Sequence, residues 1–163
     1  MSPRLLLPPA IALVAALALA WTLDRLFPLP LPDAQRDAAT VVLARDGSPL
    51  RAFADAEGVW RYPVQPEEVS PLYLEALLAY EDRWFHRHRG INPLAMGRAV
   101  VQALWHRQVV SGGSTLTMQV ARLIEPIPHT GSGKLRQMLR ALQLEWHLDK
   151  RQILTLYLNY APF

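Results

Sequence analysis

The most apolar stretch of the chain lies near its N-terminus. The 19 residues 5–23 carry no charge, with Arg4 before them and Asp24 after them. At ~1.5 Å rise per residue, a helix of this length nearly crosses a hydrocarbon core about 30 Å thick. The pattern therefore predicts a single transmembrane helix, with the positively charged residues 1–4 in the cytoplasm. A cleaved signal peptide is the alternative, because residues 18–20 resemble a cleavage site; in both cases the remaining chain is exported.

The next segments change to a short-period pattern. Residues 24–39 contain several prolines and read as a stiff linker. Residues 40–54 are typical of a β-hairpin with Asp46-Gly47 at its turn, and 59–64 of a third strand. We therefore expect a small β linker region over residues 40–66.

From residue 67 onward the apolar spacing is helical. Ser70-Pro71 is a favourable helix start, and Asp149 with Gln152 forms a capping box for the last helix. The predicted helices before that last one are separated by loops, including a Pro- and Gly-containing loop over 126–133, and cover residues 72–80, 94–110, 115–124 and 134–147. In the fourth helix the spacing predicts one buried stripe, made of Leu135, Met138, Leu139, Leu142 and Trp146.

Charge is unevenly distributed over this plan. Residues 1–80 carry six basic and nine acidic side chains, whereas residues 81–163 carry eleven basic and five acidic ones. A basic half indicates an anionic partner, which could be nucleic acid, acidic lipid or a phosphorylated substrate, although an ordinary solvated surface has the same composition. The absence of cysteine excludes disulfides and thiolate metal sites.

Three polar clusters carry candidate chemistry. In the first, Glu81 ends an apolar run and is followed by Asp82 and His88, so its carboxylate is poorly solvated and suits a general base. The alternative is that Glu81 and Asp82 simply begin a polar loop. His86 and His88 have metal-ligand spacing but lack a further ligand pair nearby.

The other two clusters are basic or rich in backbone N–H groups. Residues 112–115, Gly-Gly-Ser-Thr, lead into a helix N-terminus, which attracts phosphate, and Arg122 adds a cation. Lys134 and Gln137 share one face of the following helix. Taken alone, the first of these is an ordinary helix cap and the second a solvated face.

Taken together, the clusters resemble the glycosyltransferase domain of class A penicillin-binding proteins. Three motifs of that family recur in order. The matching positions are Glu81, Asp82, Phe85, His88 and Gly90; Gly112, Gly113, Ser114, Thr115, Thr117 and Gln119; and Lys150, Ile153, Leu154, Tyr157, Leu158 and Asn159. The family's remaining motif, Arg-Lys-x-x-Glu, is only partly kept, with Gly133, Lys134 and Gln137 at its three fixed places. The departure, and the ending Tyr160 to Phe163, resemble the 1C-type branch.

The resemblance implies a mainly α, lysozyme-like lobe over residues 67–163, preceded by the transmembrane helix and the small β-hairpin region. It also implies that this lobe is the N-terminal part of a domain that continues beyond Phe163, and that activity belongs to the complete domain. No Ser-x-x-Lys sequence occurs, so no transpeptidase is expected within these residues.

The implied reaction is polymerisation of lipid II into glycan strands, with release of polyprenyl diphosphate, on the outer side of the cytoplasmic membrane. Glu81 is the implied catalytic base. The residues implied to bind substrate are Asp82, His88, Ser114, Thr115, Gln119, Arg122, Lys134 and Gln137, with Arg122 and Lys134 on the diphosphate. The resemblance leaves a place for a divalent cation, Mg²⁺ or Mn²⁺, without a protein metal site, and implies other cell-wall synthesis proteins, but not nucleic acid, as partners.

Two other functions stay open from the sequence. A glycan-cleaving enzyme of the lysozyme or lytic transglycosylase type also uses a carboxylate in a helical lobe. A non-catalytic membrane scaffold that binds lipid II is the other, because Gln137 replaces the second carboxylate of the family.

Overall fold

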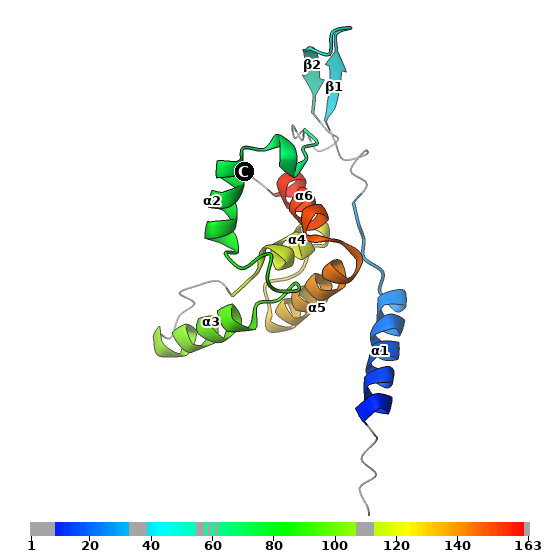
Figure 1. The fold of residues 1–163 in the computed structure, drawn as a ribbon, viewed down its shortest axis with the longest axis vertical. Coiled ribbons are helices and arrows are strands. Elements are labelled where there is room, and N and C mark those ends of the chain that lie inside the picture. The colour runs from blue at the N-terminus through cyan, green and yellow to red at the C-terminus, as the bar shows by residue number, and fades with distance from the viewer. Residues whose placement is uncertain are drawn as a thin grey trace, which may run out of the picture.

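The chain folds into a mainly helical body with a two-stranded hairpin at one end and a further helix beside it (Figure 1). The computed structural model describes residues 9–32, 39–54, 58, 60, 62–106 and 113–161. Within them the elements are α1 (Pro9–Leu26), β1 (Thr40–Leu43), β2 (Pro49–Phe53), the 3₁₀ turn η1 (Pro66–Glu68), α2 (Pro71–Glu81), α3 (Pro93–His106), α4 (Leu116–Ile124), α5 (Gly131–His147) and α6 (Lys150–Tyr160).

Helix α1 covers most of the predicted transmembrane segment. Of the span 5–23, residues 5–8 lie outside the described residues, and the helix continues to Leu26. In the described part of the chain, no helix combines the length and the apolar character that crossing a membrane needs. The end of α1 is attached to α5, because Gln143 Nε2 donates to Asp24 Oδ1 at 2.8 Å and Arg140 donates to the carbonyl of Phe27 at 2.7 Å.

The predicted hairpin is confirmed. Strands β1 and β2 pair antiparallel with a register shift at Val42/Leu43, and Gly47 in the turn has a positive φ of 84°. The predicted third strand over 59–64 is not found at residues 60 and 62–64, which are the described part of it. Val64 instead donates its backbone N–H to Asn159 Oδ1 at 2.9 Å and accepts from Asn159 Nδ2 at 2.8 Å.

Helix α4 is the centre of the core and packs against both α5 and α6. Five of its residues are buried, and the loop after α2 adds Phe85, which is 1% exposed. The buried apolar cluster consists of Phe85, Leu116, Val120, Ala121, Leu144, Ile153, Leu154, Tyr157 and Leu158.

The helices agree with the predicted ones except in α5 and in some of the bounds. Ser70 and Asp149 are the N-caps of α2 and α6, but only Asp149 makes the side-chain cap, in the predicted capping box with Gln152. Helix α3 ends at His106 in the described part of the chain, and 107–110 lie outside the described residues.

The predicted buried stripe of α5 is wrong. Four of its five members are 43–63% exposed, namely Leu135, Leu139, Leu142 and Trp146. The buried positions of α5 are instead Gly133, Gln137, Ala141 and Leu144. Small residues on this face bring α5 close to its neighbours. Helix α5 also begins at Gly131, three residues before the predicted start.

Candidate functional site

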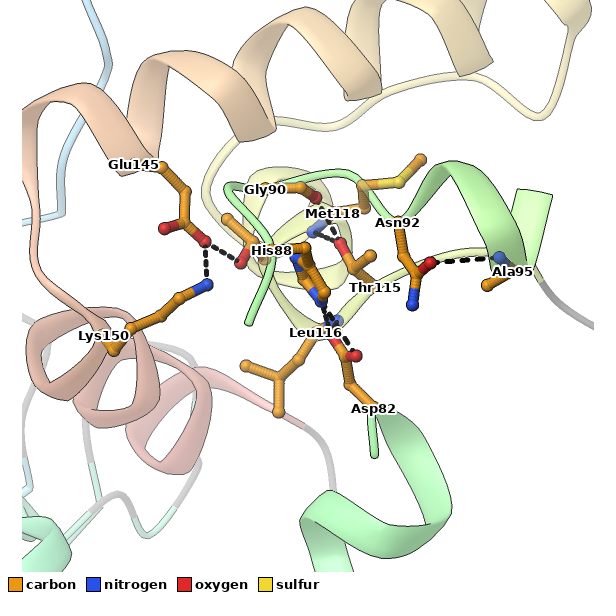
Figure 2. A network of polar contacts seen from close by, with 11 residues as sticks. Asp82, His88, Gly90, Asn92, Ala95, Thr115, Leu116, Met118, Glu145 and Lys150 are labelled. Carbon is orange, nitrogen blue, oxygen red and sulfur yellow. Dashed lines mark hydrogen bonds and ion pairs between the residues drawn. The ribbon is translucent and has the colours of Figure 1, made fainter. Parts of the chain in front are cut away.

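The loop after α2 is tied to the start of α4 by a buried carboxylate. Asp82 follows the last residue of α2 and is 7% exposed. Its Oδ2 accepts a hydrogen bond of 2.9 Å from the backbone N–H of Leu116, and both its oxygens lie 3.0 Å from His88 Nε2 (Figure 2). Because the first N–H groups of a helix have no acceptor within the helix, Asp82 satisfies one of them and places its negative charge at the positive end of α4.

Gly90 and Thr115 make a second connection between the same segments. Gly90 has a φ of 76°, and a Cβ there would lie 2.6 Å from the carbonyl oxygen of Ala141, so only glycine fits. The Gly90 carbonyl accepts from Thr115 Oγ1, which also caps α4 by accepting from Met118 N at 3.2 Å (Figure 2). The predicted site residues Asp82, His88 and Thr115 therefore shape the site from inside the protein.

Glu145, which belongs to none of the predicted motif positions, joins three helices beside this network. Its carboxylate is 7% exposed and accepts from Thr117 Oγ1 of α4 at 2.8 Å and from Lys150 Nζ of α6 at 2.5 Å (Figure 2). Lys150 also lies 4.4 Å from the ring centroid of Phe85. These contacts commit the Lys150 charge to the fold.

The predicted general base lies at the end of α2, against α4. Glu81 is half-buried, and its Oε2 accepts a 2.8 Å hydrogen bond from Gln119 Nε2. Burial raises the pKa of the Tyr157 hydroxyl, and the negative charge of Glu81 and the electrostatic effect of Tyr73 add to the increase. The structure thus brings two predicted site residues together, with Gln119 orienting the Glu81 carboxylate.

A cavity of about 250 Å³ opens beside α4 and the start of α5, and we call it the anion pocket. It is lined by Ser114, Arg122, Ile127, Pro128, His129, Thr130, Lys134 and Gln137. None of these residues is acidic, and two of them, Arg122 and Lys134, are basic. The pocket therefore suits a ligand with several negative charges.

The two cations of the anion pocket lie against a hydroxyl, an amide and an imidazole. Lys134 Nζ donates to Ser114 Oγ at 2.5 Å and to Gln137 Oε1 at 3.1 Å. An Arg122 Nη lies 3.3–3.4 Å from the ring nitrogens of His129. Burial, with a smaller effect from the Arg122 charge, lowers the pKa of Lys134. Gln137 is buried, and its Nε2 donates to the carbonyl of Met118 at 2.5 Å.

Helix α4 carries the partner of Glu81 and a pocket cation one turn apart. Gln119 and Arg122 are at positions i and i+3, and such side chains are neighbours on a helix surface, about 5–6 Å apart at Cβ. A carboxylate able to accept a proton and a pocket able to bind a departing anion therefore share one face of α4.

The residues of the anion pocket do not fit a hard divalent cation. Mg²⁺ and Mn²⁺ prefer carboxylate and other oxygen ligands, whereas the pocket has no carboxylate and sets two cations beside its hydroxyl, amide and imidazole groups. In the part of the chain that is described, no three His, Cys, Asp or Glu side chains come together as a metal site. The expected Mg²⁺ or Mn²⁺ stays a prediction of the resemblance.

His129 belongs to the pocket but has no motif signal. It lies in the predicted loop after α4, where no periodicity or cap indicates which side chains turn inward. Gly112 of the predicted phosphate-binding turn lies outside the described residues, while Gly113 approaches α3, since a Cβ there would lie 3.2 Å from Ala99 Cβ.

Comparison of the sequence with those of known proteins finds relatives of this chain. The chain is 63% identical over 144 residues to penicillin-binding protein 1C of Escherichia coli K12, which covers 88% of the chain and 18% of that protein. It is 35% identical over 111 residues to penicillin-binding protein 1B of Haemophilus influenzae (68% of the chain, 14% of the relative) and 34% identical over 131 residues to penicillin-binding protein 1A of E. coli K12 (76% and 15%). The chain thus spans less than a fifth of these relatives. A family model described as Transglycosylase matches residues 46–163. Since that match covers most of its length, the chain belongs to the transglycosylase family.

Proposed function

We propose that this chain carries the first part of a peptidoglycan glycosyltransferase, which polymerises lipid II and releases polyprenyl diphosphate. The observation that carries the proposal concerns one face of α4. On this face Gln119 binds Glu81. Arg122, one turn later, lines a pocket that has no acidic residue. The names of the similar proteins and the family match support the same reaction class.

In the proposed reaction, Glu81 removes the proton from the 4-hydroxyl of the acceptor sugar. The hydroxyl oxygen bonds to the anomeric carbon of the donor as the bond from that carbon to the diphosphate oxygen breaks. A single displacement inverts that carbon and gives a β-linked glycan. The diphosphate leaves with the bonding electron pair, and Arg122 and Lys134 stabilise its growing charge. Ser114 orients Lys134 from the side of α4.

The glycan-cleaving alternative has less support. A lysozyme-type hydrolysis releases no diphosphate, so it gives no use to the cations Arg122 and Lys134. The scaffold alternative rests on Gln137 in place of a second carboxylate, but Glu81 alone supplies the base that the proposed displacement needs.

Incubation of the full-length protein with labelled lipid II separates the three functions. The proposal expects glycan polymer and released polyprenyl diphosphate. Shortened glycan from preformed strands, without polymer, would establish cleavage instead. Binding of lipid II without any product would establish the scaffold.

For the location, we propose that residues 5–23 stay in the mature protein as the membrane anchor, with the lobe on the outer face. The support is the run of 19 uncharged residues. Intact mass of the membrane-extracted protein checks this. A mature N-terminus at Trp21 would contradict it.

A further inference from the structure

Gln137 is placed where one side chain must both donate and accept hydrogen bonds. It is 5% exposed, and its two polar atoms face opposite kinds of partner, the carbonyl of Met118 and the ammonium of Lys134. An amide satisfies both at once. An ionised carboxylate would turn one oxygen toward the Met118 carbonyl, where neither atom carries a proton.

Glu125 and Glu145 are already paired with other cations. Glu125, at the end of α4, forms ion pairs with Arg136 and with Arg140, the latter at 2.7 Å. Glu145 is bound by Lys150. Among the described residues, no acidic side chain forms an ion pair with Lys134, whose hydrogen-bond partners there are a hydroxyl and an amide oxygen.

On this basis we propose that Gln137 is a positioning residue, which fixes the Lys134 ammonium in the anion pocket without neutralising it. The pocket then presents two uncompensated cations, Arg122 and Lys134, to a diphosphate group. The inference rests on the proposed function, since it names the leaving diphosphate as the ligand. A glutamate at position 137 would place a carboxylate about where Gln137 Oε1 lies, 3.1 Å from Lys134 Nζ, and cancel one of the two charges.

The test measures binding of inorganic pyrophosphate to the full-length protein by calorimetry, at fixed ionic strength and without divalent cations. Gln137→Glu is compared with the isosteric neutral variant Gln137→Met. The matched control is Gln152→Glu, which adds the same charge at an exposed capping-box position where glutamate is equally favourable. Melting temperatures of all variants are recorded beside the affinities.

At about pH 8, we expect Gln137→Glu to bind pyrophosphate at least about tenfold more weakly than the parent, because one pocket charge is cancelled. Gln137→Met is expected to lose less affinity, and Gln152→Glu to equal the parent. The loss in Gln137→Glu is expected to shrink toward about pH 5, because the carboxylate takes up a proton and then resembles the amide. His129 is present in parent and variant alike, so its contribution largely cancels from their ratio.

Two results would overturn the inference. The first is an equal loss of affinity in the glutamate and methionine variants, because a purely structural role would not distinguish charge. The second is a glutamate variant that binds as tightly as the parent at all pH values. If the parent itself neither binds pyrophosphate nor polymerises lipid II, the proposed function fails together with this inference.

Discussion

At the residue scale, Lys134 is the side chain whose charge the anion pocket can lose. Burial and the Arg122 charge lower its pKa below the ordinary lysine value, so it becomes neutral at a lower pH than an exposed lysine. An anion binds the protonated form more tightly. Affinity is therefore full below the lowered pKa and falls as the pH rises through it.

Over a pH series that rises to 10.5, the ordinary lysine value, we predict that the pyrophosphate affinity of the parent falls relative to that of Lys134→Arg, because arginine stays charged. Calorimetry of both full-length proteins over the pH series provides the ratio. The ratio also removes the titration of pyrophosphate itself. A ratio that stays constant over this range would mean that Lys134 does not contribute its charge to binding.

Some site residues could be predicted from the sequence, and one could not. Glu81, Gln119 and Lys134 match motif positions, and Arg122 was predicted as the cation that follows the Gly-Gly-Ser-Thr turn. The structure gives these residues partners that fit their proposed roles. Their roles remain predictions. His129 could not be predicted, because a loop side chain turns toward a pocket through backbone dihedrals that no local sequence pattern encodes.

At the element scale, the start of α5 depends on one glycine. A Cβ at Gly133 would lie 2.0 Å from the carbonyl oxygen of Pro128, which is backbone and cannot rotate away. Gly131, in the same helical turn, has nothing within 4 Å of its Cβ position. Gly133 therefore makes the close approach that begins α5 beside Lys134, and Gly131 is its matched control.

We predict that Gly133→Ala destabilises the lobe by about 1–3 kcal/mol through overpacking, whereas Gly131→Ala stays within about 0.5 kcal/mol of the parent. Scanning calorimetry of the lobe transition in the full-length protein measures both. Equal melting temperatures for the two variants would show that α5 does not need the close approach at Gly133.

The exposed stripe of α5 explains a limit of pattern reading. The apolar side chains of α5 predicted the wrong face, because three of the four buried residues are small or amide residues that score as weakly apolar. Close helix packing favours Gly133 and Ala141, and a buried amide is stable when both its ends are bonded, as in Gln137. Helices α2, α4 and α6, with clear caps or apolar runs, were predicted closely.

At the scale of the whole molecule, the site depends on contacts between distant segments. Asp82 reaches the start of α4, Gly90 lies against α5, and Asn159 holds the backbone of Val64. The order of helices and the hairpin could be predicted from local spacing. These long-range contacts could not, because periodicity carries no information about which elements meet.

Glu81 is the proposed base of the glycosyl transfer. Asp82 is the neighbouring carboxylate, but both its oxygens are committed to His88 and Leu116 inside the protein, so it cannot take over. Glutamine at position 81 keeps the size of the side chain but cannot accept the proton of the sugar hydroxyl. Glu75 lies exposed on the same helix and provides the matched control.

The most direct measurement is the rate at which full-length Glu81→Gln and Glu75→Gln convert labelled lipid II to polymer, with circular dichroism and melting curves of both. Glu81→Gln is predicted to lose at least about 10²–10⁴ in rate while it stays folded and binds lipid II, and Glu75→Gln to keep the parental rate. A folded Glu81→Gln protein that polymerises lipid II at the parental rate would show that Glu81 is not the base.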